Sequence, residues 1–243
     1  MVTPAQANTL KAYDAIAPLY CEYSAKYRDY LNAIDTLVID RLTPGIRLLD
    51  IGSGDGRRLH KIASHRTLTD VTAVEPSTEM AALCRNTTGF TVHQLFGDEL
   101  DRLPESAFDA ITVLWNVFGH MVDSQIRLKT LGLMKAKLKP GGSILLDVNN
   151  RHNRAAYGHW NVLKRRAIDA FAFDEGRGDV HYHWKIGNES VPSSGHLFTP
   201  REMARLFTQS GFRVAERMSV NYANGEVSAS PFDGQLFFRL EHV

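Results

Sequence analysis

The stretch Leu48–Gly56, LLDIGSGDG, places three glycines directly behind a short apolar run. Gly52, Gly54 and Gly56 contribute no side chains to a core, so something must come close to the main chain there. A glycine-rich turn between a buried strand and a helix lets a ligand approach the backbone, and the free amides at the helix start can bind that ligand. The stretch therefore predicts a strand, a binding turn and a helix in succession.

Short apolar runs recur at fairly regular intervals on both sides of this stretch, with helix-like segments between them. Unbroken apolar runs are typical of strands that are buried on both faces of a parallel sheet. Alternation of strand and helix predicts an α/β fold with a doubly wound, Rossmann-like sheet. The seven expected strands are 47–51, 71–74, 91–95, 111–115, 143–148, 212–220 and 234–242, the last two as an antiparallel pair, and the expected helices between the first five are 57–64, 77–84 and 124–138.

Two segments do not follow this alternation. Residues 1–42 are rich in tyrosine and predict two helices, broken near Pro18, that form an N-terminal cap. Residues 149–198 are too polar for another strand and helix unit and predict an insertion over the sheet. The sheet pattern resumes at Thr199, which begins a helix with a capping box. We expect one domain over residues 1–243.

The overall charge is close to neutral, with 28 lysines and arginines against 27 acids. This balance does not favour a nucleic-acid or anionic membrane partner. Only two cysteines occur, Cys21 and Cys84, which fits a reduced compartment. There is neither a signal-peptide core nor a run long enough to span a membrane. We therefore expect a soluble cytoplasmic protein.

Two classes of ligand suit the glycine turn: dinucleotides and S-adenosylmethionine (SAM). The dinucleotide fingerprint G-x-G-x-x-G requires a third glycine at position 57, which is Arg57 here. Asp50, at the end of the first strand, would repel a pyrophosphate, whereas it would tolerate the ammonium and sulfonium groups of SAM. The electrostatics therefore favours SAM.

The segment from Asp50 to Gly56 resembles the D/E-x-G-x-G-x-G motif of class I SAM-dependent methyltransferases, and the resemblance extends from about residue 44 to 240. It implies SAM as cofactor and S-adenosylhomocysteine (SAH) as product. It also implies that Glu75 accepts the ribose hydroxyls and that Asp98 or Glu99 faces the adenine. Asp55 departs from the small residue common at its position. The expected cofactor residues are Tyr20, Asp50, Gly52, Ser53, Gly54, Glu75, Pro76, Asp98, Glu99 and Trp115.

Three segments can shape an acceptor pocket above the sheet: the N-terminal cap, the loop 115–121 and the insertion. By resemblance His120 is a catalytic candidate, with a structural role as the alternative. His183 is a second candidate, because His181 and His183 alternate and would share one face of a strand. A metal would need His196 or Asp179 as a further ligand, and we expect none. The expected substrate residues are Tyr13, Asn116, Asn149, His181 and Tyr182.

Three functions remain open at this point. The favoured one is methyl transfer to an oxygen or nitrogen of a small-molecule acceptor, by an in-line displacement that needs alignment and exclusion of water. The second is methylation of tRNA or another RNA, suggested by the basic residues between 151 and 166. The third is SAM binding without catalysis. The sequence indicates neither the acceptor nor the oligomeric state.

Overall fold

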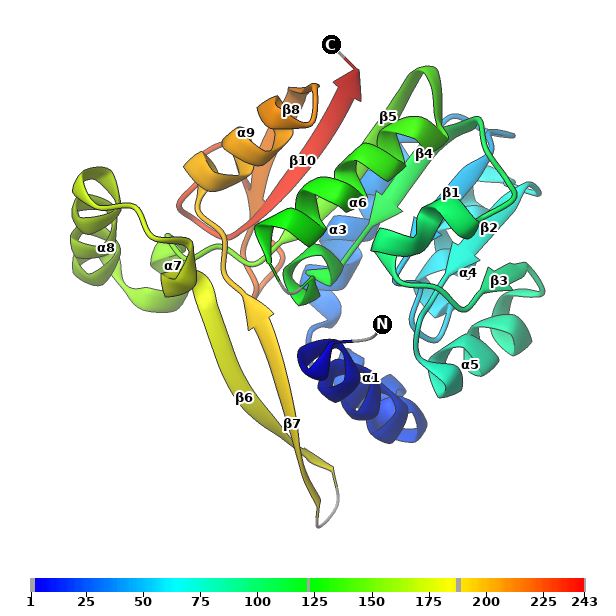
Figure 1. Cartoon of the computed structure of the whole chain (residues 1–243), viewed down its shortest axis with the longest axis horizontal. Helices are drawn as coiled ribbons and strands as arrows, with labels where there is room; N and C mark the ends of the chain where they lie inside the picture. The colour runs from blue at the N-terminus through cyan, green and yellow to red at the C-terminus, as the bar shows by residue number, and fades with distance from the viewer. Residues whose placement is uncertain (1–2, 122, 187–188, 243) are drawn as a thin grey trace.

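The computed structural model describes residues 3–121, 123–186 and 189–242. It contains a central eight-stranded sheet with helices on both faces, and a separate two-stranded hairpin that projects away from the sheet (Figure 1). The predicted α/β, doubly wound class is confirmed. The strands of the central sheet are β1 (Leu48–Ile51), β2 (Val71–Val74), β3 (Thr91–His93), β4 (Phe108–Val113), β5 (Leu138–Val148), β8 (Phe212–Val220), β9 (Val227–Ser228) and β10 (Gln235–His242).

The strand order is β3-β2-β1-β4-β5-β10-β8-β9. Neighbours from β3 to β5 pair in parallel, whereas β10 pairs antiparallel with both β5 and β8, as expected for the last two long strands. The chain winds in opposite directions from β1 and β4, so a crevice opens at the carboxyl ends of these strands. The expectation of seven strands was one too few, because two-residue β9 is too short to leave a pattern.

Helices cover the two faces of this sheet. The predicted helices are present as α4 (Arg57–Arg66), α5 (Thr78–Thr88), α6 (Ser124–Lys137) and α9 (Pro200–Gln209). The capping box of α9 is confirmed: the Glu202 amide donates to Thr199 Oγ1, and the Thr199 amide donates to Glu202 Oε2. Ser77 caps α5 in a similar way through the Met80 amide.

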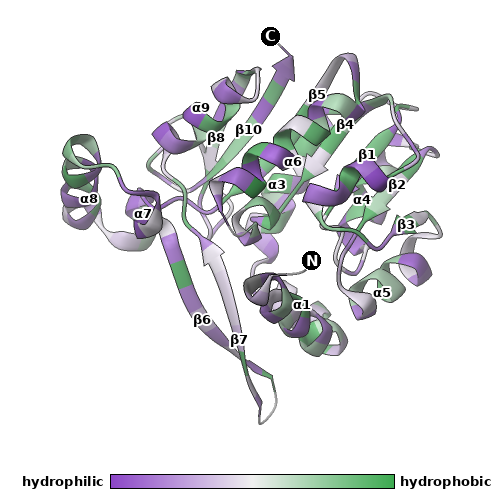
Figure 2. Ribbon diagram, viewed as in Figure 1, coloured by the Kyte–Doolittle hydropathy of each residue, from purple (hydrophilic) through white to green (hydrophobic). Residues whose placement is uncertain are grey.

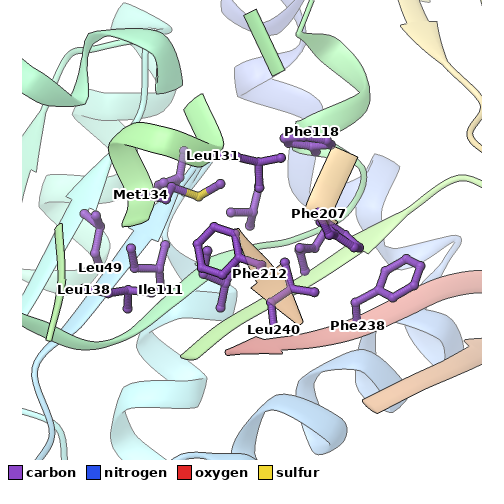
Figure 3. Close-up of a cluster of buried hydrophobic side chains, with 14 of the residues drawn as sticks. Leu49, Ile111, Phe118, Leu131, Met134, Leu138, Phe207, Phe212, Phe238 and Leu240 are labelled. Carbon is purple, nitrogen blue, oxygen red and sulfur yellow. The ribbon is translucent and has the colours of Figure 1, made fainter. Parts of the chain in front are cut away.

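Alternate residues of the central strands feed two separate cores. Leu49 and Ile111 belong to the core beneath α6 and α9, to which Leu131 of α6 and Phe207 of α9 also contribute (Figure 3). Leu48, one residue away, belongs to the opposite core beneath α4 and α5. Burying one such side chain contributes about 1.5–3 kcal/mol, so both faces hold β1 firmly at the centre of the molecule.

The N-terminal segment contains three α-helices rather than the two that we expected. They are α1 (Pro4–Ile16), α2 (Tyr20–Ala25) and α3 (Arg28–Arg41). Pro18 lies in the short 3₁₀ turn that separates α1 from α2, as expected. The second break, at residues 26–27, contains no proline or glycine to indicate it.

The insertion contains two helices, α7 (Arg154–Tyr157) and α8 (His159–Phe171), and the hairpin strands β6 (Asp179–Ile186) and β7 (Glu189–His196). The two helices lie at the edge of the molecule, and the hairpin extends from them past α1 (Figure 1). Within the described ranges, no helix is long and apolar enough to cross a membrane.

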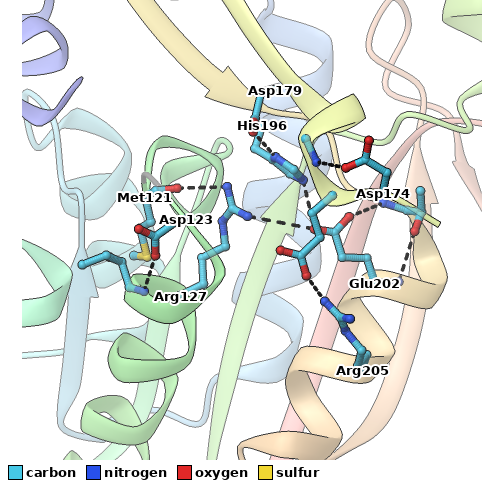
Figure 4. A network of polar contacts seen from close by, with 12 residues as sticks. Met121, Asp123, Arg127, Asp174, Asp179, His196, Glu202 and Arg205 are labelled. Carbon is cyan, nitrogen blue, oxygen red and sulfur yellow. Dashed lines mark hydrogen bonds and ion pairs between the residues drawn. The ribbon is translucent and has the colours of Figure 1, made fainter. Parts of the chain in front are cut away.

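A buried polar network fixes the base of the hairpin to the helices of the main sheet (Figure 4). The ring of His196 lies between two carboxylates, with Nδ1 2.7 Å from Asp179 Oδ1 and Nε2 2.9 Å from Glu202 Oε1. The fully buried Arg127 of α6 donates to the Met121 carbonyl at 3.0 Å and lies 4.0 Å from Glu202. The network thereby joins β7, α9, α6 and the loop that follows β4.

Candidate functional site

A cavity of about 380 Å³ lies at the carboxyl ends of β1, β2 and β4, beneath α1 and α2. This volume is in the range of small-molecule sites, roughly 300–1,000 Å³. Residues that follow the strands β1 to β4 meet residues of the N-terminal helices there. The predicted site residues that line it are Tyr13, Tyr20, Asp50, Gly52, Ser53, Gly54, Glu75, Pro76, Asp98, Trp115 and His120.

The glycine turn is tightly enclosed by two other segments. Gly52 has φ of +74°, and a β-carbon there would lie 2.4 Å from Cγ2 of Val117. Gly54 has φ of +55°, and a β-carbon there would lie 3.5 Å from the ring of Tyr20. Any side chain at 52 would therefore be strained and would collide with the loop after β4. The backbone at Gly54 forms the floor of the cavity and Tyr20 lies above it.

Asp50 is buried at the end of β1, with 6% of its surface exposed. Thr112 Oγ1 donates to Asp50 Oδ1 at 2.5 Å. Burial raises the pKa of Asp50 above its ordinary value, which means that the protein leaves this carboxylate short of stabilising partners. A cationic ligand group in the cavity would supply the missing stabilisation.

Glu75, at the end of β2, is equally buried and is oriented by two backbone amides. The Gly54 amide donates to Oε2 at 2.8 Å, and the Ser77 amide donates to Oε1 at 2.9 Å. Each oxygen keeps a further lone pair for a hydroxyl donor. Burial raises the pKa of Glu75 to about 7, despite these hydrogen bonds. The geometry suits recognition of two neighbouring hydroxyls.

The structure distinguishes between Asp98 and Glu99. Glu99 accepts a hydrogen bond from the Phe96 amide at 3.0 Å and another from Arg102 at 2.8 Å, so it stabilises its own turn. Asp98 lines the cavity, and its nearest cation is Lys129 at 4.0 Å. Of the two acids, Asp98 is therefore the one that is placed to contact a ligand in this cavity.

Trp115 and Asn116 form a strained corner after β4, with φ of +59° and +61°. The Trp115 amide donates to the buried Asp147 at 2.6 Å, and its indole donates to Tyr222 at 2.8 Å. Asn116 accepts a hydrogen bond from the Asn149 amide at 2.8 Å. Trp115 lines the cavity, whereas Asn116 and Asn149 brace the corner and are not among its lining residues.

His120 has two hydrogen-bond partners from distant parts of the chain. Its Nδ1 lies 2.9 Å from the Ser194 carbonyl of β7, and its Nε2 lies 3.1 Å from the Tyr13 hydroxyl of α1. A carbonyl can only accept, so Nδ1 carries the proton and Nε2 of the neutral ring accepts from Tyr13. Burial lowers the pKa of His120, which keeps this neutral form present near pH 7.

The structure does not bring His181 and His183 to the cavity. Both side chains lie on the exposed face of β6, and the opposite face carries Tyr182 and Trp184. The Trp184 ring packs 5.1 Å from the ring of Tyr13, so this face covers α1, while Tyr182 is not among the lining residues. The alternation of apolar and polar residues along β6 contained this signal, because an apolar face points inward.

The cavity wall also carries a group of charged residues that were not expected from the sequence. Asp35 of α3 is almost fully buried and accepts hydrogen bonds from Arg58 at 2.8 Å and Lys61 at 3.0 Å. All three line the cavity. The i, i+3 spacing of Arg58 and Lys61 on the predicted helix indicated a shared face, but their acidic partner is distant in sequence.

No metal centre emerges from the described residues: in none of the ranges 3–121, 123–186 and 189–242 do three or more His, Cys, Asp or Glu side chains group so that they could hold an ion. His196 and Asp179, the metal ligands considered from the sequence, belong instead to the network at the base of the hairpin.

Comparison with known proteins agrees with this architecture. Residues 23–217 match a family model described as a methyltransferase domain. Solved structures with the same fold include the CcbJ methyltransferase of Streptomyces caelestis, with TM-score 0.69, 14% identity and coverage of 97% of this chain and 99% of that one. For the sugar N-methyltransferase KedS8 of a Streptoalloteichus species, the TM-score is 0.60 and the identity 19%, with coverage of 93% of this chain and 92% of that one.

A third structure, a DhpI complex with SAH, gives a TM-score of 0.62 at 19% identity, with coverage of 97% of this chain and 96% of that one. No curated protein matches the chain.

Proposed function

This chain belongs to the methyltransferase-domain family and is a SAM-dependent methyltransferase, and from that premise we propose that it methylates an oxygen or nitrogen of a small-molecule acceptor. SAM supplies a methyl group that is activated by its attachment to a sulfonium. The protein's own contribution is to align the two partners, exclude water and receive a proton.

The residues around the glycine turn would hold SAM. Glu75 accepts the two ribose hydroxyls and Asp98 faces the adenine, while the buried Asp50 balances the cationic amino-acid end. Arg58 is held by Asp35, with both Nε and Nη2 2.8 Å from Asp35 Oδ1. This guanidinium is placed on the cavity wall to receive the carboxylate of the same amino-acid end.

The Tyr13 and His120 pair would act on the acceptor. Nε2 of His120 is unprotonated and points at the Tyr13 hydroxyl, and both side chains line the cavity. A proton that must leave the acceptor passes to Nε2, directly or through the Tyr13 hydroxyl. Burial raises the pKa of Tyr13, so this hydroxyl stays protonated and does not compete as a nucleophile. The Tyr13 and His120 hydrogen bond is the single observation that carries the proposal.

The basic residues of the insertion argue against an RNA substrate. Arg151 pairs with Asp169 at 2.6 Å, and Arg154 pairs with Asp233. These pairs neutralise part of the basic stretch that the sequence suggested as a surface for a nucleic-acid backbone. The near-neutral net charge of +1 agrees with this.

The experiment is a methyl-transfer screen. The full chain is incubated with labelled SAM and, separately, with pools of small amines, pools of small hydroxyl compounds and bulk tRNA, and SAH formation and labelled products are measured by mass spectrometry. We expect SAH to form with a small-molecule pool. Labelling of tRNA alone would overturn the proposal in favour of RNA methylation. Tight SAM binding without SAH formation in any pool would overturn it in favour of a non-catalytic protein.

A further inference from the structure

A second cavity, of about 480 Å³, lies wholly within the insertion. It shares no lining residue with the cofactor cavity. Half of its lining residues are arginines, contributed by three different segments. The lining residues are Arg151, Arg165, Ile168, Arg177, Val180 and Leu197.

The buried member of this arginine group is neutralised within the protein. Arg151 has 6% of its surface exposed and donates to Asp169 Oδ1 at 2.6 Å. His152 Nε2 lies 2.9 Å from the other oxygen of Asp169. Both oxygens of this one buried carboxylate are therefore engaged, and its single negative charge balances only one of the three arginines.

The other two arginines retain most of their hydrogen-bonding capacity. Arg165 donates to the Arg151 carbonyl at 3.2 Å and stacks 4.3 Å above the ring of Tyr157. Arg177 donates to the Ala172 carbonyl at 2.5 Å. A guanidinium offers five N–H donors in a planar fork, and each of these groups uses one on a backbone carbonyl.

The charge in this cavity is positive overall. Arg177 lies 3.7 Å from Asp169 and 3.9 Å from Asp174, and Asp174 is largely exposed, so its charge is screened by solvent. Arg165 has no acidic partner among the ion pairs of the described residues. Three guanidiniums and one buried carboxylate carry a net charge of about +2, which a ligand with about two negative charges would balance.

We propose that this second cavity binds the phosphate group of a phosphorylated ligand, held by Arg165 and Arg177 and backed by Arg151. A phosphate matches the requirement because it carries up to two negative charges and accepts paired hydrogen bonds from arginine forks. The site is separate from methyl transfer and does not depend on the identity of the methyl acceptor.

The same phosphate chemistry has two sources: a small phosphorylated molecule or a lipid headgroup. The helix α8, which contributes Arg165 and Ile168 to this cavity, also exposes large apolar side chains, with Trp160 74% and Phe171 93% exposed. Ile168, at the cavity wall, is 51% exposed. Figure 2 shows hydrophobic and hydrophilic residues interleaved along α8. Exposed aromatic residues beside arginines are also a feature of helices that lie on anionic bilayers.

The test is calorimetric titration of the full chain, saturated with SAH, with inorganic phosphate and with pyrophosphate. Saturation with SAH prevents either anion from binding in the cofactor cavity. We expect saturable binding that Arg165→Gln and Arg177→Gln each weaken about tenfold. Arg166→Gln is the matched control, because Arg166 is the next residue of α8, stacks on Phe232 and does not line the cavity.

The outcomes separate the sources. Co-sedimentation with phosphatidylcholine vesicles containing phosphatidic acid, reduced by both Trp160→Ala and Arg165→Gln, identifies a lipid headgroup. Binding of the free anions without vesicle binding identifies a soluble phosphorylated ligand. The proposal is overturned if neither the anions nor the vesicles bind saturably, or if Arg166→Gln weakens binding as much as Arg165→Gln. Unchanged SAH affinity in every variant verifies that the fold is intact.

Discussion

Two side chains that line the first cavity, Glu75 and His120, are held by hydrogen bonds that span very different distances along the chain. Glu75 receives hydrogen bonds from residues 2 and 21 positions away. His120 is held by Tyr13 and by Ser194, which are 107 and 74 positions away. The proposed cofactor side is thus built from neighbouring strand ends, whereas the proposed acceptor side depends on contacts with both the N-terminal cap and the insertion.

This difference implies that the two sides can be damaged separately. A substitution at a strand end should weaken SAM binding and leave the contacts of the acceptor side in place. A substitution at the meeting point of α1, β7 and the loop after β4 should slow turnover and spare SAM binding. Comparison of Glu75→Ala with His120→Asn tests this separation directly.

The largest effect is expected for Glu75→Ala. The change removes the acceptor of two backbone amides and of the two ribose hydroxyls, so we expect SAM affinity to fall about a hundredfold or more. Isothermal titration calorimetry with SAM and with SAH measures these affinities. Glu79→Ala, which removes an exposed acid from α5, is the matched control. Unchanged affinity in Glu75→Ala would refute the ribose assignment.

A smaller effect is expected for His120→Asn. We expect kcat to fall about tenfold to a hundredfold, at or below the lower end of the contribution of one proton-transfer group because water can still take up the proton, with little change in SAM affinity. His183→Asn should leave both quantities unchanged, because His183 lies on the exposed face of β6. The pH profile adds a second readout: wild-type kcat should decrease on the acidic side, below the ordinary pKa of histidine, and His120→Asn should lose that decrease. Equal rates in both histidine variants would argue for a structural His120.

The smallest effect concerns the ionisation of Glu75. Because its pKa is raised to about 7, acidification through neutrality protonates the carboxylate. SAM affinity should therefore fall about threefold to tenfold per unit of pH below 7, and Glu75→Gln should lack this dependence.

The stability of the ligand-free protein should respond in the opposite direction. The folded state binds the Glu75 proton more tightly than the unfolded state does, because the pKa of this carboxyl is about 7 in the folded state and 4.5 in the unfolded state. The stabilisation from this proton is complete below the unfolded pKa and is lost as pH rises through about 7. Urea unfolding of wild type and Glu75→Gln across this interval measures the difference, and parallel curves would contradict the prediction.

The cofactor side could be predicted from the sequence because its signals are local. The run from Leu48 to Gly56 specifies a strand, a turn and a helix within a few residues, and Glu75 follows at the end of the next strand. Fold class and SAM as cofactor follow from such segments together with the family resemblance. The choice between Asp98 and Glu99 required the structure, because it depends on which one stabilises its own turn.

The acceptor side could be predicted only in part because its geometry depends on long-range packing. Tyr13 and His120 were each singled out, but nothing in the sequence indicated that they touch. His183 is exposed because its neighbour Trp184 points the other way, toward Tyr13 of α1. This packing joins two segments that are far apart in the sequence. The arginine cavity likewise brings together residues from a loop, a helix and a turn.

The helix α1 is anchored to both sides by consecutive residues. Tyr13 bonds to His120, and Asp14 accepts a hydrogen bond from Ser77 Oγ at 2.5 Å, at the start of α5. Because these two anchors are consecutive residues of one helix, a displacement of α1 that breaks the contact with His120 would also strain the contact with Ser77. The helix therefore couples the position of the loop after β4 to the position of the start of α5.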